Sequence, residues 1–185
     1  MSRRILSLFA NIGVAEAYLQ ELSNVRVVVA NELLKRRAEL YQKIYPETEM
    51  VCGDITDEGT YQKVLQKSKK AKVDTVMATP PCQGMSTAGR KIKFDERNSL
   101  VMYAIRFIHD LKPKYALIEN VTDFIITPII YHGKETMLPD VIHSELGEYY
   151  DKFKLITNDG YTEQFRMQVE QPHKKLTLKN EKNMI

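Results

Sequence analysis

A cysteine with nucleophilic potential follows two prolines at the end of an apolar segment. The run from Val73 to Ala78 has the pattern of a buried strand. Pro80 and Pro81 end it, because proline lacks the backbone N–H that would continue a ladder. Cys82 comes next and opens a polar loop. A thiol at such a strand end can act as a nucleophile once it ionises, although this segment alone better fits a cysteine that merely follows a turn.

Four further strands are predicted from apolar runs, and polar residues follow each of them. The strands cover residues 3–9, 25–30, 48–52 and 115–118, and the polar positions after them include Asn11, Asn31, Glu32, Gly53, Asp54, Glu119 and Asn120. Ligands of open α/β sheets bind outside the carboxyl ends of the strands, so these residues and Cys82 are predicted to share one rim. Each acid taken alone could instead cap a helix or end in solvent.

Helical segments separate the strands and complete the predicted architecture. They cover residues 14–22, 33–44, 57–69 and 98–111, with Asp57 as the N-cap of the third. This repeated alternation predicts an α/β fold with a doubly wound, mostly parallel sheet and right-handed crossovers. Beyond residue 124 the pattern weakens to one helix, 139–150, and one strand, 152–157.

The composition is that of a single globular domain. The 185 residues are 43% hydrophobic and 28% charged, with a formal net charge of +3. This charge permits a polyanionic partner without demanding one. The sequence contains no recognisable secretory segment and no run of membrane-spanning length, so no membrane partner is expected. The two cysteines are expected to be free thiols in a reducing cytoplasm, with Cys52 buried as packing.

The first turn and the end of the second strand suggest a nucleotide-like ligand. A tight turn into a helix lets backbone N–H groups approach a ligand. Glu32 lies roughly 20 residues past this turn, where an acid normally grips a ribose diol, and Asp54 could accept from an adenine amino group. A dinucleotide fingerprint needs three glycines and only Gly13 is present, which favours a ligand without a pyrophosphate.

Taken in order, these segments resemble the catalytic domain of the cytosine-5 DNA methyltransferases, which use S-adenosylmethionine. The matching stretches are residues 8–13, 31–32, 53–56, 80–83, 97–100 and 119–121. Proline-cysteine-glutamine followed by glutamate-asparagine-valine is a strong signature, whereas the turn and the Gly-Asp-Ile stretch would be weak alone. The resemblance implies a Rossmann-like S-adenosylmethionine-dependent methyltransferase fold with an incomplete C-terminal part.

The resemblance also implies a role for each matching residue. Cys82 matches the nucleophile that adds to cytosine C6, Glu119 matches the carboxyl that holds N3, and Asn120 is expected to hold the loop geometry. The residues that match cofactor contacts are Phe9, Ile12, Gly13, Glu32, Leu33, Asp54, Ile55, Pro81 and Leu100. For Ile12, Ile55 and Leu100, ordinary core packing is the alternative.

The loop after Cys82 resembles the mobile catalytic loop of the family. A target cytosine must leave the duplex before a thiol can reach its C6, and this loop would close over the flipped nucleotide. Its polar and basic side chains are expected to contact DNA phosphates. They are Ser86, Arg90, Lys91, Lys93 and Arg97. A solvated basic loop is the plain alternative.

The sequence departs from the family pattern at both ends. Asn11 and Val14 stand where the family usually has glycine, and the bulk of Val14 is expected to lie near the methionine end of the cofactor. Residues 159–168 echo a glutamine-x-arginine-x-arginine motif, in which Gln164 and Arg166 match and Gln168 replaces the second arginine. By this match Arg166 joins the expected catalytic residues.

No stretch resembles the target-recognition domain that follows this motif in the family. We therefore expect a catalytic portion over residues 1–158, and a degenerate motif and poorly ordered tail over 159–185. The chain is expected to act on double-stranded DNA with a complementary subunit that carries the recognition domain, or as a homodimer through an exposed sheet edge. The alternatives are an inactive cofactor- or partner-binding remnant and a transfer-RNA cytosine-5 methyltransferase.

Overall fold

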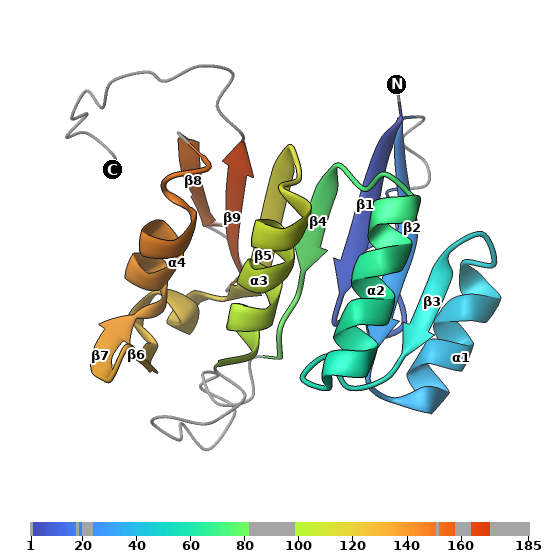
Figure 1. Cartoon of the computed structure of the whole chain (residues 1–185), viewed down its shortest axis with the longest axis horizontal. Coiled ribbons are helices and arrows are strands. Elements are labelled where there is room, and N and C mark those ends of the chain that lie inside the picture. The colour runs from blue at the N-terminus through green and yellow to red at the C-terminus, as the bar shows by residue number, and fades with distance from the viewer. Residues whose placement is uncertain are drawn as a thin grey trace.

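The structure is a computed structural model of the chain, and its central feature is one large sheet (Figure 1). It describes residues 2–17, 19, 24–81, 99–150, 152–157 and 164–170. Seven strands form this sheet in the order β3-β2-β1-β4-β5-β9-β8. Their bounds are Arg3–Leu8 (β1), Val25–Glu32 (β2), Glu49–Cys52 (β3), Thr75–Ala78 (β4), Tyr115–Val121 (β5), Lys152–Thr157 (β8) and Gln164–Glu170 (β9).

The first five strands are parallel, which confirms the predicted doubly wound sheet. β1 lies at the centre and pairs in parallel with β2 and β4, while β3 and β5 extend the sheet on either side. β9 is antiparallel to both β5 and β8. The carboxyl ends of the parallel strands therefore meet at one edge, where the sequence predicted a site.

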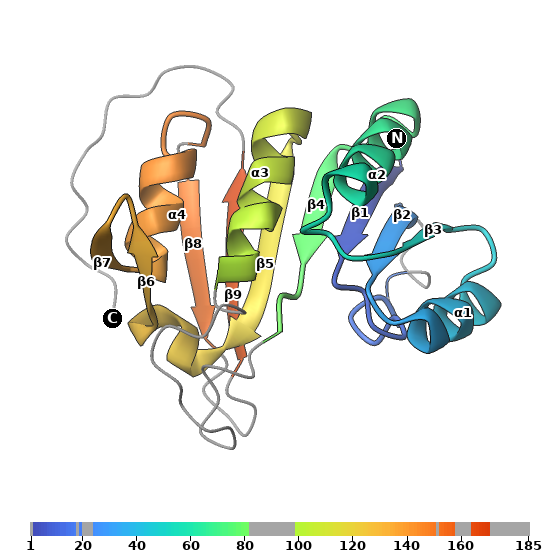
Figure 2. The same cartoon turned by 60° about the horizontal axis from the view of Figure 1, so that its bottom comes forward.

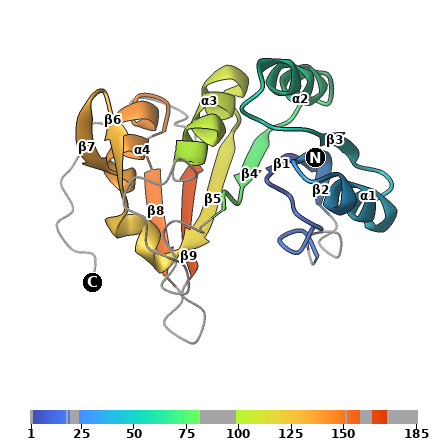
Figure 3. The ribbon, with the colours of Figure 1, turned by 90° about the horizontal axis from the view of Figure 1, so that it is seen from below.

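Helices cover the sheet unequally in the described part of the chain. α2 (Glu58–Lys70), α3 (Val101–Leu111) and α4 (Leu138–Leu146) lie side by side on one face (Figures 2 and 3). Their side chains join Leu6, Leu8 and Val29 in the main core. α1 (Lys35–Ile44) belongs to a second cluster through Tyr41, with Ala30 of β2. Val29 and Ala30 are adjacent and point to opposite faces, so α1 packs on the face opposite α2.

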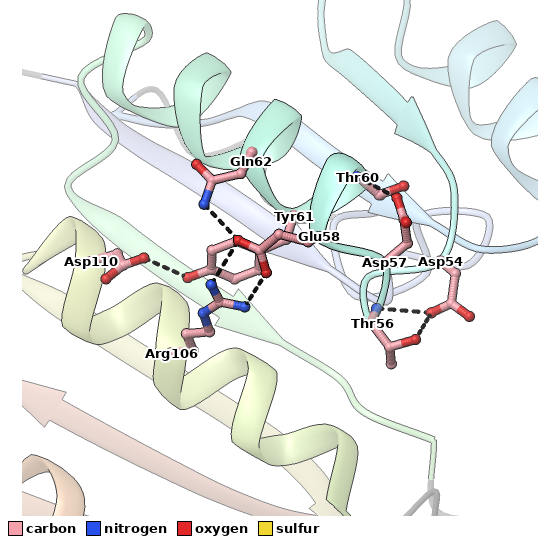
Figure 4. A network of polar contacts seen from close by, with 9 residues as sticks. All are labelled: Asp54, Thr56, Asp57, Glu58, Thr60, Tyr61, Gln62, Arg106 and Asp110. Carbon is pink, nitrogen blue, oxygen red and sulfur yellow. Dashed lines mark hydrogen bonds and ion pairs between the residues drawn. The ribbon is translucent and has the colours of Figure 1, made fainter.

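An ion pair and a stacked ring join α2 to α3 (Figure 4). Both nitrogens of the Arg106 fork reach the Glu58 carboxylate, at 2.8 and 2.9 Å, and the guanidinium lies over the Tyr61 ring. Hydrogen bonds from Arg106 and Gln62 lower the pKa of Glu58 to about 2. Tyr61 also donates from its hydroxyl to Asp110 at 2.9 Å. The pair links α2 to α3 at the surface, where such ion pairs contribute modestly to stability.

Two smaller elements follow β5. A short 3-10 helix, Thr122–Ile126, leads into a hairpin of β6 (Pro128–Tyr131) and β7 (Lys134–Met137) that the sequence did not predict. Residues 139–150 were expected to form one helix, whereas α4 ends at Leu146. Among the described residues no helix has both the length and the apolar character needed to span a bilayer.

The helix predicted over residues 14–22 is wrong in its described part. Residues 14–17 are turns, closed by short-range bonds such as Glu16 N–H to the Gly13 carbonyl at 3.2 Å. The apolar pattern of this segment suggested an amphipathic helix, which would bury Val14 and expose Glu16. The two side chains point the other way. Val14 is 70% exposed while Glu16 is buried. Glu16 points into the interior, where its carboxylate accepts a hydrogen bond from Ser7.

Two further expectations fail at strand ends. Cys52 was expected to be buried and is exposed, because it ends β3 at the edge of the sheet. β5 was expected to end at Ile118, but it continues to Val121. β4 stops at Ala78, opposite Ile118, and β9 supplies the partner for the last three residues of β5.

The outer side of β5 is therefore paired with β9, so the sheet extends beyond its parallel strands. Residues 164–170, which include Gln164 and Arg166 of the expected degenerate motif, form β9, and the outer strands of the sheet are β3 and β8. Residues 171–185, which were predicted to be poorly ordered, lie outside the described part of the chain.

The start of α2 offers a test of the local structure. Asp57 is its N-cap, as predicted, and accepts from Thr60 N–H at 2.8 Å. Asp57→Ala removes this acceptor and is expected to lower the free energy of unfolding by about 1 kcal/mol in urea denaturation. Asp57→Asn keeps an acceptor and serves as the matched control. Equal losses in both variants would contradict the capping role.

Candidate functional site

The turn after β1 is built on left-handed backbone. Phe9, Asn11 and Gly13 have φ angles of 59°, 53° and 85°. Asparagine tolerates this region better than most residues, so Asn11 can occupy a position where glycine is usual. Ala10 N–H donates to the Asn31 carbonyl at 2.9 Å, which fastens the turn to the end of β2.

Glu32 connects this turn to the start of α1. Its Oε2 accepts from Asn11 N–H and its Oε1 accepts from Leu34 N–H, each at 2.9 Å. A carboxylate has about four acceptor positions, so each oxygen keeps capacity for a ligand hydroxyl. Leu33, between Glu32 and Leu34, has an exposed side chain. The arrangement provides an acceptor and an apolar surface at one point of the rim.

The end of β3 lies against the end of β2. Asn31 donates from Nδ2 to the carbonyls of Val51 and Gly53, at 3.0 and 3.1 Å. Asp54 follows with an exposed side chain, and its Oδ1 accepts from both the backbone N–H and the hydroxyl of Thr56. These bonds hold Asp54 in one orientation at the carboxyl edge of the sheet (Figure 4).

The end of β4 is fastened to β5 by the buried Asn120. Its Nδ2 donates to the Pro80 carbonyl at 3.0 Å, and its Oδ1 accepts from Val121 N–H at 2.9 Å. This is the loop-holding contact expected for Asn120. Glu119 precedes it on β5, is half-buried, and has Arg166 of β9 as its register partner.

Thr79 ties the same strand end to the first turn. Its backbone N–H donates to the Leu8 carbonyl at 3.2 Å, and its hydroxyl donates to the Phe9 carbonyl at 3.1 Å. The sequence did not indicate this residue, because a threonine before two prolines carries no signal of its partner 70 residues away. With Thr79 and Asn120, three strand ends form one bonded rim.

A buried acid lies beneath the rim and was also missed. Glu16 accepts from the hydroxyl of Ser7 on β1 and from the Tyr41 hydroxyl of α1. It is 1% exposed, and its Oε2 has no hydrogen-bond partner in the described part of the chain. Burial raises the pKa of Glu16, against hydrogen bonds that lower it. The sequence signal for Glu16 was a single acidic residue within the otherwise apolar residues 12–19.

The structure brings together six of the predicted cofactor residues, on the ends of β1, β2 and β3. They are Phe9, Ile12, Gly13, Glu32, Leu33 and Asp54. Ile55 instead packs in the main core, while Pro81 and Leu100 are half-buried on either side of residues 82–98, which lie outside the described part of the chain. Cys82, Ser86, Arg90, Lys91, Lys93 and Arg97 lie outside the described residues.

The family follows from comparison with known proteins. A model of the C-5 cytosine-specific DNA methylases matches residues 3–174. The chain belongs to this family. It is 42% identical over 162 residues to the Type II methyltransferase M1.HgaI of Avibacterium volantium, a match covering 84% of this chain and 45% of that protein. It is 30% identical over 153 residues to M.AquIA of Picosynechococcus, covering 73% of this chain and 61% of that one.

Two relatives from Spodoptera frugiperda widen the comparison. A tRNA (cytosine(38)-C(5))-methyltransferase is 30% identical over 127 residues, covering 67% of this chain and 37% of that protein. The crystal structure of a DNMT2 mutant superimposes with a TM-score of 0.67 at 21% identity, covering 100% of this chain and 54% of that one. At this identity the superposition supports the methylase fold. The chain thus spans about half the length of the relatives it matches.

Removing the amide of Asn120 tests the bond that joins β4 to β5. Asn120→Asp keeps the acceptor for Val121 N–H and loses the donor to the Pro80 carbonyl. We expect a loss of about 1–3 kcal/mol in the free energy of unfolding, because a buried carbonyl is left without a partner. Urea denaturation measures it. A variant as stable as the natural protein would show that the Pro80 contact contributes nothing.

The buried Glu16 predicts a pH dependence of stability. Its pKa is raised in the folded protein from an ordinary 4.5, so its contribution is fully present below pH 4.5 and is lost as the pH rises through the raised pKa. Glu16→Gln cannot titrate, so the stability difference between the natural protein and this variant should shift against the natural protein above pH 4.5. Urea titrations from acid to neutral pH measure it. A difference independent of pH would contradict the prediction.

Proposed function

We propose that the chain is the catalytic part of a DNA (cytosine-5)-methyltransferase that uses S-adenosylmethionine and a Cys82 adduct. The observation that carries this proposal is the bonded rim, in which Asn120 fastens the Pro80 end of β4 to the strand that bears Glu119. Cys82 follows Pro80 by two residues in the sequence. Membership of the methylase family supplies the reaction class.

The groups at the rim fit the proposed cofactor. Glu32 and Asp54 are acceptors for a ribose diol and an adenine amino group, and Leu33 offers apolar surface beside them. The left-handed turn at Phe9 to Gly13 is proposed to bring backbone close to the methionine end. When bound, S-adenosylmethionine supplies an electrophilic methyl group on a sulfonium. Pro81 and Leu100 are proposed to border the reacting end, while the buried Ile55 supports the site from the core.

The chain's own residues are proposed to activate the base. The Cys82 thiolate adds to C6 of the flipped cytosine, which moves electron density to C5 and makes it nucleophilic. Glu119 in its protonated form holds N3 and stabilises the added electrons. After C5 has been methylated, a base from solvent takes the C5 proton, and the electrons of that C–H bond re-form the C5–C6 double bond and expel the Cys82 thiolate. Arg166 lies opposite Glu119 in the β5–β9 register and is proposed to act with Glu119 at the flipped base.

DNA binding is proposed to need the catalytic loop and further polypeptide. Ser86, Arg90, Lys91, Lys93 and Arg97 would contact the phosphates of double-stranded DNA around the flipped nucleotide. Since the matched relatives are about twice as long, we propose that a target-recognition part, on a complementary subunit or a longer chain, reads the bases. A homodimer is the alternative assembly. The site of action is proposed to be the cytoplasm.

The nucleophile is tested with the other cysteine as the control. The chain is assayed alone and co-expressed with the open reading frame immediately downstream of its gene. The assay measures methyl transfer from labelled S-adenosylmethionine to duplex DNA. Cys82→Ala is expected to reduce transfer roughly a thousandfold or more, because no adduct can form, while Cys52→Ser retains activity. Full activity in Cys82→Ala would overturn the assignment. Cofactor binding with no transfer under either condition would favour the non-catalytic remnant.

RNA is the second candidate substrate, because one matched relative is a tRNA (cytosine(38)-C(5))-methyltransferase. The same transfer assay with duplex DNA and transfer RNA in competition separates the two. We expect label in DNA, and preferential labelling of transfer RNA would replace the DNA proposal.

A further inference from the structure

The tyrosine just after α1 packs against the first turn. Tyr45 is 7% exposed, and its hydroxyl donates to the Gly13 carbonyl at 2.7 Å. Its ring lies so close to Gly13 that a Cβ added there would sit 2.1 Å from a ring carbon. Gly13 is thus required for its positive φ and for the space that Tyr45 occupies.

The Gly13 carbonyl is held by two donors. Besides the Tyr45 hydroxyl it accepts from Glu16 N–H at 3.2 Å, so both of its lone pairs are used. The peptide between Gly13 and Val14 is trans, so its N–H points opposite to its C=O. Fixing the carbonyl toward Tyr45 therefore directs Val14 N–H away from the interior.

Val14 N–H is without a hydrogen-bond partner among the described residues. The side chain of Val14 is 70% exposed. An outward backbone donor at a turn between a strand and a following segment is suited to an anion such as a carboxylate.

A second layer supports Tyr45. Its ring packs against that of Tyr41, with centroids 4.8 Å apart, and Tyr41 donates to the buried Glu16 at 3.4 Å. Glu16 also accepts from Ser7 of β1. The Tyr45 hydroxyl is therefore held in place by groups anchored in both α1 and the central strand.

We propose that Tyr45 is a positioning residue which, through the Gly13 carbonyl, aims Val14 N–H at the carboxylate of S-adenosylmethionine. The inference rests on the proposed function and deepens it. It also bears on the departure at Val14, where the direction of the backbone is set by the buried Tyr45 hydroxyl through the Gly13 carbonyl.

The test compares two tyrosine-to-phenylalanine variants of the full chain. Tyr45→Phe removes the hydroxyl and keeps the ring against Gly13. Tyr61→Phe removes a hydroxyl with a similar bond, to Asp110 at 2.9 Å, between α2 and α3. Calorimetry measures the Kd for S-adenosylmethionine and for adenosine, which lacks the carboxylate. Thermal unfolding shows whether each variant is folded.

Tyr45→Phe is expected to raise the Kd for S-adenosylmethionine about fivefold and to leave the Kd for adenosine unchanged. Tyr61→Phe should change neither. Unchanged S-adenosylmethionine binding in Tyr45→Phe, or equal losses for both ligands, would overturn the positioning role while leaving the proposed function standing. A natural chain that binds neither ligand would overturn the proposed function itself.

Discussion

The carboxylate of Glu32 is the contact on which the geometry of the rim depends. It takes one backbone N–H from the turn after β1 and one from the segment that starts α1. Both donors lie in irregular chain, where the ordinary strand and helix bonds do not fix direction. A single buried acid therefore sets the relative position of two loops, and the same acid remains available to a ligand hydroxyl.

The other strand ends are fastened in the same way, by side chains bonding to backbone. Thr79 and Asn120 hold the end of β4 to its neighbours on either side, since the prolines at 80 and 81 have no N–H with which to continue a ladder. Proline thus ends the strand, and Asn120 replaces the lost backbone bonds with one from an amide. Pro80, two residues before Cys82, is therefore held in place by this bond.

The described helices concentrate on one face of the sheet. α2, α3 and α4 bury the main core, while the other face carries α1 and a small cluster around Tyr41 and Tyr45 (Figure 3). The first turn, part of the rim proposed to hold the cofactor, joins this smaller cluster through Ala10. Buried hydroxyl and carboxyl groups, among them Glu16, also bond there.

The sequence by itself determined the parallel sheet, the N-cap at Asp57 and the family, because each depends on local residue types in a fixed order. Only the tertiary structure decided the rest. It showed that residues 14–17 turn around a buried Glu16, that β9 extends β5 to Val121, and that Cys52 is exposed at the edge. It also showed that Thr79, Tyr45 and Glu32 bond across 21 to 70 residues of chain. Hydrophobic periodicity reports which face of an element is buried, but it does not identify the distant group that a polar side chain meets there.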